Sequence, residues 1–413
     1  MKSCRLLVAI CVACLLTAAA SAQEWPRFRG PNGAGQSEAT TIPTAWTAEE
    51  VLWKVELPGK GNASPVLWGD RIFLTSANPA DGTRHVTCHS ARDGRLLWQR
   101  DYPSTTHPLH QQNTFASSTP AADAKRVYCA WATPQAVTLV ALDHEGTEAW
   151  RIDLGPFVSQ HGFGASPIVY RDLVILPNDQ DGESFLVAVD AASGAIRWKV
   201  PRKVLNEQNA SYAAPCVFER PGRTDELIVS GRSHGVTALN PLDGTTLWEA
   251  GVLERRPVGS PIIVAGMVLA ACGEGSGNNN LIALRPPATA GAEPTVAYRI
   301  DRTSAPYVPT MVAFGELVFL WSDKGIVTCI DAQSGSVHWR ERVGGNYYSS
   351  PLRVANCVYC VSLEGDVVAL AASDKFELLG RSSLGETTRA TPAVALGRMF
   401  LRTESHLVAV GQR

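Results

Sequence analysis

The stretch Leu186-Val-Ala-Val-Asp-Ala-Ala-Ser-Gly-Ala-Ile-Arg-Trp198 decides the fold, because the chain repeats its pattern. A short apolar strand is followed by an Asp-x-x-x-Gly turn and by a second strand that reaches a Trp. The same phrase returns as Cys329-Ile-Asp-Ala-Gln-Ser-Gly-Ser-Val-His-Trp339. Each copy opens on a two-residue step that ends in proline, and the eight steps are Ser64-Pro65, Thr119-Pro120, Ser166-Pro167, Ala214-Pro215, Ser260-Pro261, Val308-Pro309, Ser350-Pro351 and Thr391-Pro392.

Successive prolines of these steps are 41 to 55 residues apart. A period of about 40–50 residues with several short strands per copy is typical of a β-propeller. Four strands, A to D, fit into each copy, and the turns between them carry the Asp and Gly that tight turns favour. The sequence therefore predicts an all-β fold, an eight-bladed β-propeller of four-stranded antiparallel blades.

The two ends of the chain complement each other in this pattern. The eighth copy stops after its third strand, residues 407–410, and lacks a strand D. Residues 51–57 supply an unassigned strand, with Trp53 in the position of the strand-D aromatic residue. We therefore predict that this N-terminal strand completes the last blade and closes the ring, which removes free sheet edges.

Strand D carries an aromatic residue in most copies, and we interpret it as a wedge between neighbouring blades. Burying a Trp removes about 150–250 Å² from water, which contributes at most roughly 4–6 kcal/mol. The alternative, a surface that stacks carbohydrate, needs exposed aromatic rings. The seventh copy has only Phe376 and two leucines there, and the residues of the other copies are Trp53, Trp98, Trp150, Trp198, Trp248, Tyr298 and Trp339.

Residues 1–22 have the pattern of a signal peptide. Lys2 and Arg5 precede an apolar segment, residues 6–16, that is too short to span a bilayer, and Ala20-Ser21-Ala22 is a cleavage motif. Neither Cys11 nor Cys14 has the upstream Leu of a lipoprotein signal. We expect cleavage after Ala22 and a periplasmic or secreted protein, with an N-terminal extension over residues 23–50 and the propeller over residues 51–413.

Composition excludes some partners and some cysteine chemistry. A net charge of -2 gives no reason to expect nucleic acid or an anionic membrane. Seven of the ten cysteines follow Ala22, so at least one stays unpaired within a monomer. Cys357 and Cys360 lie in one predicted strand, about 10 Å apart on opposite faces, and cannot form a disulfide. A role as small apolar core residues is favoured.

Function is expected where the copies differ, in the residues that precede each proline. Strand A is innermost in a blade, so these residues surround the central channel on the face formed by the D-to-A and B-to-C loops. Converging amide, imidazole, phenol and guanidinium groups suit a polar or anionic small molecule. The alternative is that they only solvate a water-filled channel. The ligand-binding candidates are Asn62, Asn113, His161, Asn209, Tyr212, Arg256, Tyr307, Asn346, Tyr348 and Arg389.

Other motifs predict less. The segment from Asp179 to Glu183 contains alternating Asp residues and a Gly but lacks the final Glu of a calcium loop, so a solvated turn is favoured. His107, His110 and His161 are conceivable metal ligands, yet their spacing fixes no site. We predict no metal centre, and the catalytic residues stay unknown.

On the quoted phrases, the chain resembles the pyrroloquinoline-quinone-type (PQQ-like) repeat family from about residue 50 to residue 413. The opening Trp25-Pro-Arg-Phe-Arg-Gly-Pro-Asn-Gly33 also resembles the start of many secreted bacterial members. The resemblance implies an eight-bladed propeller whose tryptophans dock neighbouring blades. It leaves two functions open. Quinoprotein alcohol and sugar dehydrogenases hold the quinone and calcium in the channel and use an Asp base, whereas members like the outer-membrane assembly propeller are scaffolds without catalysis.

The sequence departs from the enzymes of that family. It has no adjacent Cys-Cys pair, and no calcium-plus-base set can be matched position by position, so no catalytic residue is transferred. We therefore expect a non-catalytic propeller that binds a small polar ligand or a protein partner, with no transmembrane segment and no firmly predicted cofactor. The alternative is a PQQ- and calcium-dependent alcohol or sugar dehydrogenase that uses the central channel.

Overall fold

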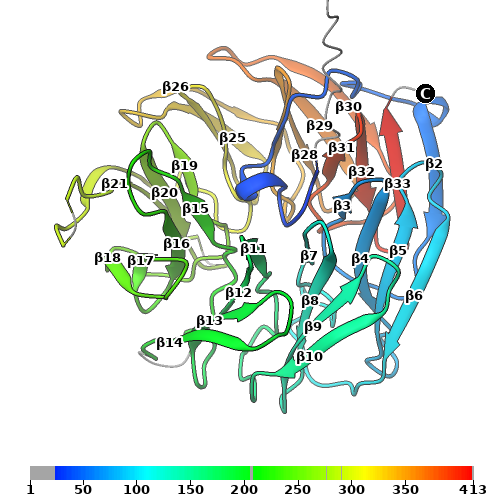
Figure 1. The fold of residues 1–413 in the computed structure, drawn as a ribbon. Coiled ribbons are helices and arrows are strands. Elements are labelled where there is room, and N and C mark those ends of the chain that lie inside the picture. The colour runs from blue at the N-terminus through cyan, green and yellow to red at the C-terminus, as the bar shows by residue number, and fades with distance from the viewer. Residues whose placement is uncertain (1–23, 205–207, 276, 290, 412–413) are drawn as a thin grey trace, which may run out of the picture.

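Eight twisted sheets surround one central axis in the computed structural model (Figure 1). The structure describes residues 24–204, 208–275, 277–289 and 291–411. The predicted signal peptide lies outside these residues. Each blade is an antiparallel meander of four strands, with strand A at the channel and strand D at the outside. The predicted all-β, eight-bladed propeller is therefore confirmed.

The first four blades follow one another along the chain. Blade 1 consists of β3 (Val66–Trp68), β4 (Arg71–Ala77), β5 (Arg84–Ser90) and β6 (Leu96–Tyr102). Blade 2 consists of β7 (Ala121–Ala122), β8 (Arg126–Ala132), β9 (Val137–Asp143) and β10 (Glu148–Asp153). Blade 3 consists of β11 (Ile168–Tyr170), β12 (Leu173–Asn178), β13 (Phe185–Asp190) and β14 (Ile196–Pro201). Blade 4 consists of β15 (Cys216–Phe218), β16 (Glu226–Gly231), β17 (Gly235–Leu239) and β18 (Thr246–Ala250).

The remaining blades complete the ring. Blade 5 consists of β19 (Ile262–Val264), β20 (Met267–Cys272), β21 (Asn280–Arg285) and β22 (Thr295–Ile300). Blade 6 consists of β23 (Val312–Phe314), β24 (Leu317–Trp321), β25 (Ile326–Asp331) and β26 (Val337–Arg342). Blade 7 consists of β27 (Leu352–Val354), β28 (Cys357–Val361), β29 (Asp366–Ala371) and β30 (Leu378–Ser383). Blade 8 consists of β31 (Ala393–Ala395), β32 (Arg398–Arg402), β33 (His406–Gly411) and β2 (Val51–Glu56).

The ring closes as the sequence predicts, because β2 is the outermost strand of blade 8. It pairs antiparallel with β33, with Trp53 opposite Ala409. The Trp53 ring lies 5.9 Å from the Phe400 ring, measured between centroids. The first and the last strand of the propeller thus share one blade, and no strand of blade 8 is left without its neighbour.

The strand-D aromatic residues dock most blades on the next one. The Trp150 Nε1–H donates to the Ala191 carbonyl at 3.0 Å, in the C-to-D turn of blade 3. Gly194 of that turn has a φ of 73°, and a Cβ there would lie 2.7 Å from the Trp150 ring. The Gly-x-x-x-Trp phrase therefore couples two blades, since its Gly receives the aromatic ring of the preceding blade. Equivalent bonds are made by Trp98, Trp198, Tyr298 and Trp339.

Blade 7 lacks the strand-D aromatic residue because another segment covers that position. Residues 42–46 of the N-terminal extension lie against β30. A Cβ at Gly380 would be 2.3 Å from the Thr44 carbonyl oxygen, and the Trp46 N–H donates to Ser382 Oγ at 2.7 Å. Trp46 is buried in the same hydrophobic cluster as Trp25.

The N-terminal extension also fills one end of the central channel, where Figure 1 shows the dark-blue segment in the middle of the ring. Trp25 pairs with Leu67 of β3, and β1 (Gln36–Ser37) adds a parallel strand to the inner edge of β27. Between them, the short helix η1 (Pro31–Gly33) turns the segment back. A second short helix, η2 (Ala48–Glu50), leads into β2. We call residues 24–37 the plug.

A belt of hydrogen bonds joins the blades around the channel. In seven of the eight junctions, a backbone N–H at the start of strand A donates to a Ser or Thr hydroxyl of the next blade at 2.8–3.1 Å. The eighth junction lacks this bond because blade 4 has Ala214, which cannot accept from the Ser166 N–H. The hydroxyls belong to Ser64, Thr119, Ser166, Ser260, Thr310, Ser350 and Thr391.

The belt corrects the predicted start of blade 6. The sequence pattern placed strand A at the Val308-Pro309 step, but β23 begins at Val312 and the belt hydroxyl is that of Thr310. The register follows the hydroxyl rather than the proline, since the hydroxyl makes the bond to the neighbouring blade. Pro309 therefore lies one residue before the belt instead of one residue after it.

Completing the belt should stabilise the protein. Ala214→Ser places a hydroxyl where the other seven blades have one, so we expect the free energy of unfolding to rise by about 1 kcal/mol. Urea denaturation followed by Trp fluorescence measures this change. Ser260→Ala is the matched control and should lower stability by about 1–2 kcal/mol, because it leaves the buried Ala214 N–H unpaired. A destabilised A214S protein would contradict this account of the belt.

Candidate functional site

A cavity of about 610 Å³ lies on the predicted face of the propeller. Its walls come from the D-to-A loops and from the B-to-C turns of blades 5 and 6, and its floor includes Phe28 of the plug and six belt residues. Because the plug enters and leaves by the A-to-B turns, it closes the channel beneath the cavity. The cavity is therefore accessible from the face of the D-to-A and B-to-C loops.

Eight of the ten candidate residues line this cavity. Residues preceding strand A come together there because all eight A strands start at the same end of the channel. These residues are Asn62, Asn113, His161, Tyr212, Arg256, Tyr307, Tyr348 and Arg389. The other two candidates, Asn209 and Asn346, lie outside the cavity lining.

One wall is formed by the D-to-A loops that lead into blades 3 and 5. The Arg256 guanidinium donates from Nη1 to His161 Nε2 at 3.3 Å, and the His110 ring stacks on His161 with centroids 4.6 Å apart. Burial, together with the charge of Arg256 and the proximity of His110, lowers the pKa of His161 to about 4. His161 is therefore neutral at pH 7, and its Nδ1 carries the proton because its Nε2 accepts from Arg256.

The second wall is formed by the loops that lead into blades 2, 7 and 8. Arg389 donates to Gln112 Oε1 from Nε at 3.2 Å and from Nη2 at 2.7 Å. Its guanidinium also lies 5.5 Å from the centre of the Tyr348 ring. This arginine is thus held by a neutral amide and an aromatic face.

Two carboxylates line the cavity, and both already have partners. Asp323 accepts the backbone N–H groups of Tyr307 at 3.0 Å and Val308 at 3.1 Å. Burial raises the pKa of Asp323 above its usual value, although these two bonds oppose the rise. Glu274 is paired with Arg255, 3.7 Å away. Neither carboxylate makes an ion pair with the arginines of the two walls.

Asn209 and Asn346 have structural partners instead. The Asn209 Nδ2 donates to the Lys203 carbonyl at 3.2 Å, and the side chain is almost fully buried. The Asn346 Nδ2 donates to Glu364 Oε1 at 2.9 Å on the exposed surface. A position before strand A therefore does not by itself aim a side chain into the channel.

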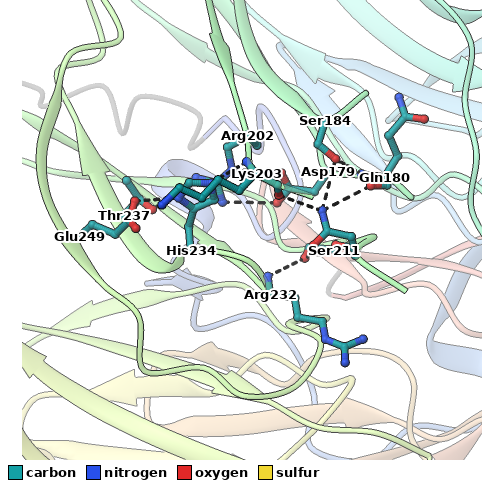
Figure 2. A network of polar contacts seen from close by, with 11 residues as sticks. Asp179, Gln180, Ser184, Arg202, Lys203, Ser211, Arg232, His234, Thr237 and Glu249 are labelled. Atoms are coloured by element: carbon teal, nitrogen blue, oxygen red, sulfur yellow. Dashed lines mark hydrogen bonds and ion pairs between the residues drawn. The ribbon is translucent and has the colours of Figure 1, made fainter. Parts of the chain in front are cut away.

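A polar network joins described residues of blades 3 and 4 beside the cavity (Figure 2). The Arg202 Nε donates to Asp179 Oδ1 at 3.1 Å, and both side chains are buried. His234 accepts the Lys203 N–H at Nε2, 2.9 Å away, and contacts Glu249 through Nδ1 at 2.7 Å. Asp179 is thus a buried ion-pair partner of Arg202, and the expectation of a solvated turn is wrong at Asp179 and Gln180, which are both buried.

Some cavity residues were not among the candidates. The sequence indicates His110 only as a metal ligand, and Gln112 lies one residue farther from Pro120 than the candidate Asn113. Asn279, Asp323 and Lys324 stand in B-to-C turns, which open on the same face as the D-to-A loops. Inspecting those turns together with the D-to-A loops would have found them.

The donor set does not fit a calcium ion with a quinone. Among the described residues, no group of three or more His, Cys, Asp or Glu side chains could hold a metal ion. The two cavity carboxylates are engaged by backbone N–H groups and by Arg255. All seven cysteines after Ala22 are free thiols in separate or opposite-facing positions, so none forms a vicinal pair.

Comparison with known proteins identifies the family. A family model described as outer membrane protein assembly factor BamB matches residues 44–114, 82–340 and 301–412. The chain belongs to this family. The BamB-type model thus covers every blade of the ring, and the resemblance to PQQ-like repeats is confirmed.

The relatives of this chain include both an assembly factor and a dehydrogenase. BamB of Yersinia pestis is 21% identical over 328 residues, which cover 79% of this chain and 69% of that protein. A polyvinylalcohol dehydrogenase of a Pseudomonas species is 28% identical over 167 residues, 36% of this chain. That match spans only 24% of the dehydrogenase. The structure of a europium-containing methanol dehydrogenase superposes with a TM-score of 0.68 at 13% identity, covering 94% of this chain and 89% of that one, which shows a shared fold.

Proposed function

We propose that this protein is a non-catalytic propeller that binds a protein partner or a small polar ligand on the face of its D-to-A and B-to-C loops. The observation that carries the proposal is the cavity of about 610 Å³ on that face, where two arginines have only neutral partners. Such a cavity has the size and the convergent polar groups of a ligand site.

Family membership supports a binding role. The matching family model is described as an assembly factor, and a protein partner is the coarse function that this likeness favours. We also propose a periplasmic or secreted location, based on the predicted signal peptide over residues 1–22. In the described part of the chain, no helix is long and apolar enough to cross a bilayer.

A quinone-dependent dehydrogenase is the second candidate, favoured by the likeness to the Pseudomonas dehydrogenase over 167 residues. It would place PQQ and calcium in the central channel. The plug closes the channel beneath the cavity, and both cavity carboxylates already have partners. These features disfavour the arrangement, because calcium requires about six to eight oxygen ligands. We therefore derive no catalytic step for this chain.

A reconstitution assay separates the two candidates. The mature protein is incubated with PQQ and calcium, and dye reduction is followed over a panel of alcohols and sugars. We expect no dye reduction above that of heat-denatured protein, while a quinoprotein alcohol dehydrogenase reconstituted in parallel is active. Saturable, quinone-dependent dye reduction would overturn the proposal of a non-catalytic propeller.

A further inference from the structure

Three cations at the cavity have neutral hydrogen-bond partners. Arg256 donates to His161, Arg389 donates to Gln112, and the Lys324 ammonium donates to Asn346 Oδ1 at 3.2 Å. Of the ion pairs between described residues, none contains any of these three side chains. Elsewhere on the chain, exposed arginines such as Arg151 and Arg197 pair with carboxylates. The three cations of the cavity therefore make no ion pair with a described carboxylate, although Asp323 and Glu274 belong to the same lining.

Unused donors accompany the Arg256 guanidinium. Arg256 Nε and His161 Nδ1 are both buried without a hydrogen-bond partner. Both atoms carry a proton, because a guanidinium has donors only and because His161 Nε2 is the accepting nitrogen. Next to them, Ala214 interrupts the belt, so no hydroxyl receives the Ser166 N–H. Arg256 and His161 thus contribute donors to this wall, and a carboxylate oxygen can accept from such donors. The Asn279 Oδ1 of the cavity lining is a buried acceptor without a partner among the described residues.

The belt adds further donors to the floor. Each belt hydroxyl accepts an N–H from the preceding blade with its oxygen, which leaves its own proton free to donate. Six of the seven hydroxyls line the cavity between the two arginine walls. A ligand in this cavity would thus meet hydroxyl donors on the floor and the guanidinium groups of Arg256 and Arg389 in the walls.

We propose that this cavity binds a ligand with at least two carboxylates, one at Arg256 and His161 and the other at Arg389 and Gln112. The inference rests on the proposed binding function and names the chemistry of what is bound. A carboxylate matches the planar fork of a guanidinium with two parallel hydrogen bonds, which are stronger than the bonds to a neutral imidazole or amide. The ligand is either a small polycarboxylic acid or the acidic side chains of a partner segment.

Isothermal titration calorimetry on the mature chain tests this inference with two probes. Citrate represents the small acid, and a hexaglutamate peptide represents the acidic segment. Trimethyl citrate and a hexaglutamine peptide are their uncharged controls, and inorganic phosphate tests for general anion binding. We expect saturable binding of citrate or of hexaglutamate, and none of the uncharged controls. Citrate alone identifies a small acid as the source, and hexaglutamate alone identifies a partner segment.

Matched variants locate the site. Arg256→Gln and Arg389→Gln should each weaken binding about tenfold or more, because each loses charge-assisted hydrogen bonds worth about 1.5–3 kcal/mol. Arg302→Gln is the control, since Arg302 is an exposed arginine outside the cavity lining. Arg256→Lys keeps the charge but not the fork and should give intermediate affinity. Circular dichroism melts verify that the variants fold.

Several outcomes would overturn the inference. For the probes, these outcomes are no binding of citrate or hexaglutamate, binding of trimethyl citrate equal to that of citrate, or phosphate binding as tight as citrate binding. For the variants, the outcome is an R302Q protein that binds the probe as weakly as the R256Q protein. These failures differ from a failure of the proposed function, which appears as dye reduction. If the protein reduces no dye and binds no carboxylate, the proposal of a non-catalytic propeller stands and only the proposed class of ligand is wrong.

Discussion

Deleting residues 51–57 should prevent the chain from folding cooperatively. Without β2, the β33 strand loses its antiparallel partner from Val51 to Glu56, and blade 8 exposes an open edge. The deletion also removes Trp53, which packs on Phe400 and on Gly94 of blade 1. Losing this ring alone costs about 3 kcal/mol, and the stability of a folded domain is only about 5–15 kcal/mol.

Two point variants keep this prediction testable if the truncated chain aggregates. Trp53→Ala in the full chain should lower the free energy of unfolding by about 3 kcal/mol in urea denaturation. Glu56→Ala is the matched control on the same strand, where the side chain is exposed, and should change it by less than about 0.5 kcal/mol. A truncated chain that melts like the wild type would show that β2 does not close the ring.

Arg29→Met should be the most damaging single substitution in the plug. Arg29 is fully buried and donates to five backbone carbonyls, among them Thr310 O and Met311 O at 2.8 Å and Pro351 O at 3.1 Å. Burial lowers the pKa of Arg29 to about 9, so the group is still charged at pH 7. Removing the guanidinium leaves several buried carbonyls without a donor, which should lower the free energy of unfolding by about 3–5 kcal/mol.

Arg27 offers the matched comparison for this substitution. It is also buried in the plug, but one donated bond is described for it, to the Pro215 carbonyl, and its Nε has no partner. Arg27→Met should therefore destabilise the protein clearly less than Arg29→Met in the same urea denaturation experiment. Equal losses for the two variants would mean that burial, rather than the bonds to the A strands, determines the contribution of each arginine.

Repetition made the ring predictable from the sequence. Eight copies of one phrase, a final copy without strand D and an unassigned Trp53 strand were enough to give eight blades and their closure. The aromatic residues were also interpretable, because a residue that recurs at one position in seven of the eight blades indicates a contact that those blades share. The pattern also predicted which residues surround the channel, because strand A is the innermost strand of each blade.

The plug could not be predicted in this way. Residues 24–37 occur once and have no apolar period. Their contacts include arginine bonds to carbonyls that immediately precede β23 and β27, far away in the chain. The register of blade 6 was missed because the pattern followed Pro309, whereas the contact between blades depends on the Thr310 hydroxyl. Asn209 and Asn346 precede strand A like the other candidates but lie outside the cavity lining. Position in the loop alone does not determine the direction of a side chain.

The most direct test of the proposed non-catalytic role is the absorption spectrum of the protein purified from a host grown with PQQ and calcium. We expect a spectrum of tryptophan and tyrosine alone, without a chromophore at longer wavelengths, because the plug and the engaged carboxylates do not fit a quinone with calcium. A stoichiometric quinone absorbance that persists through gel filtration would contradict it and would establish the dehydrogenase alternative.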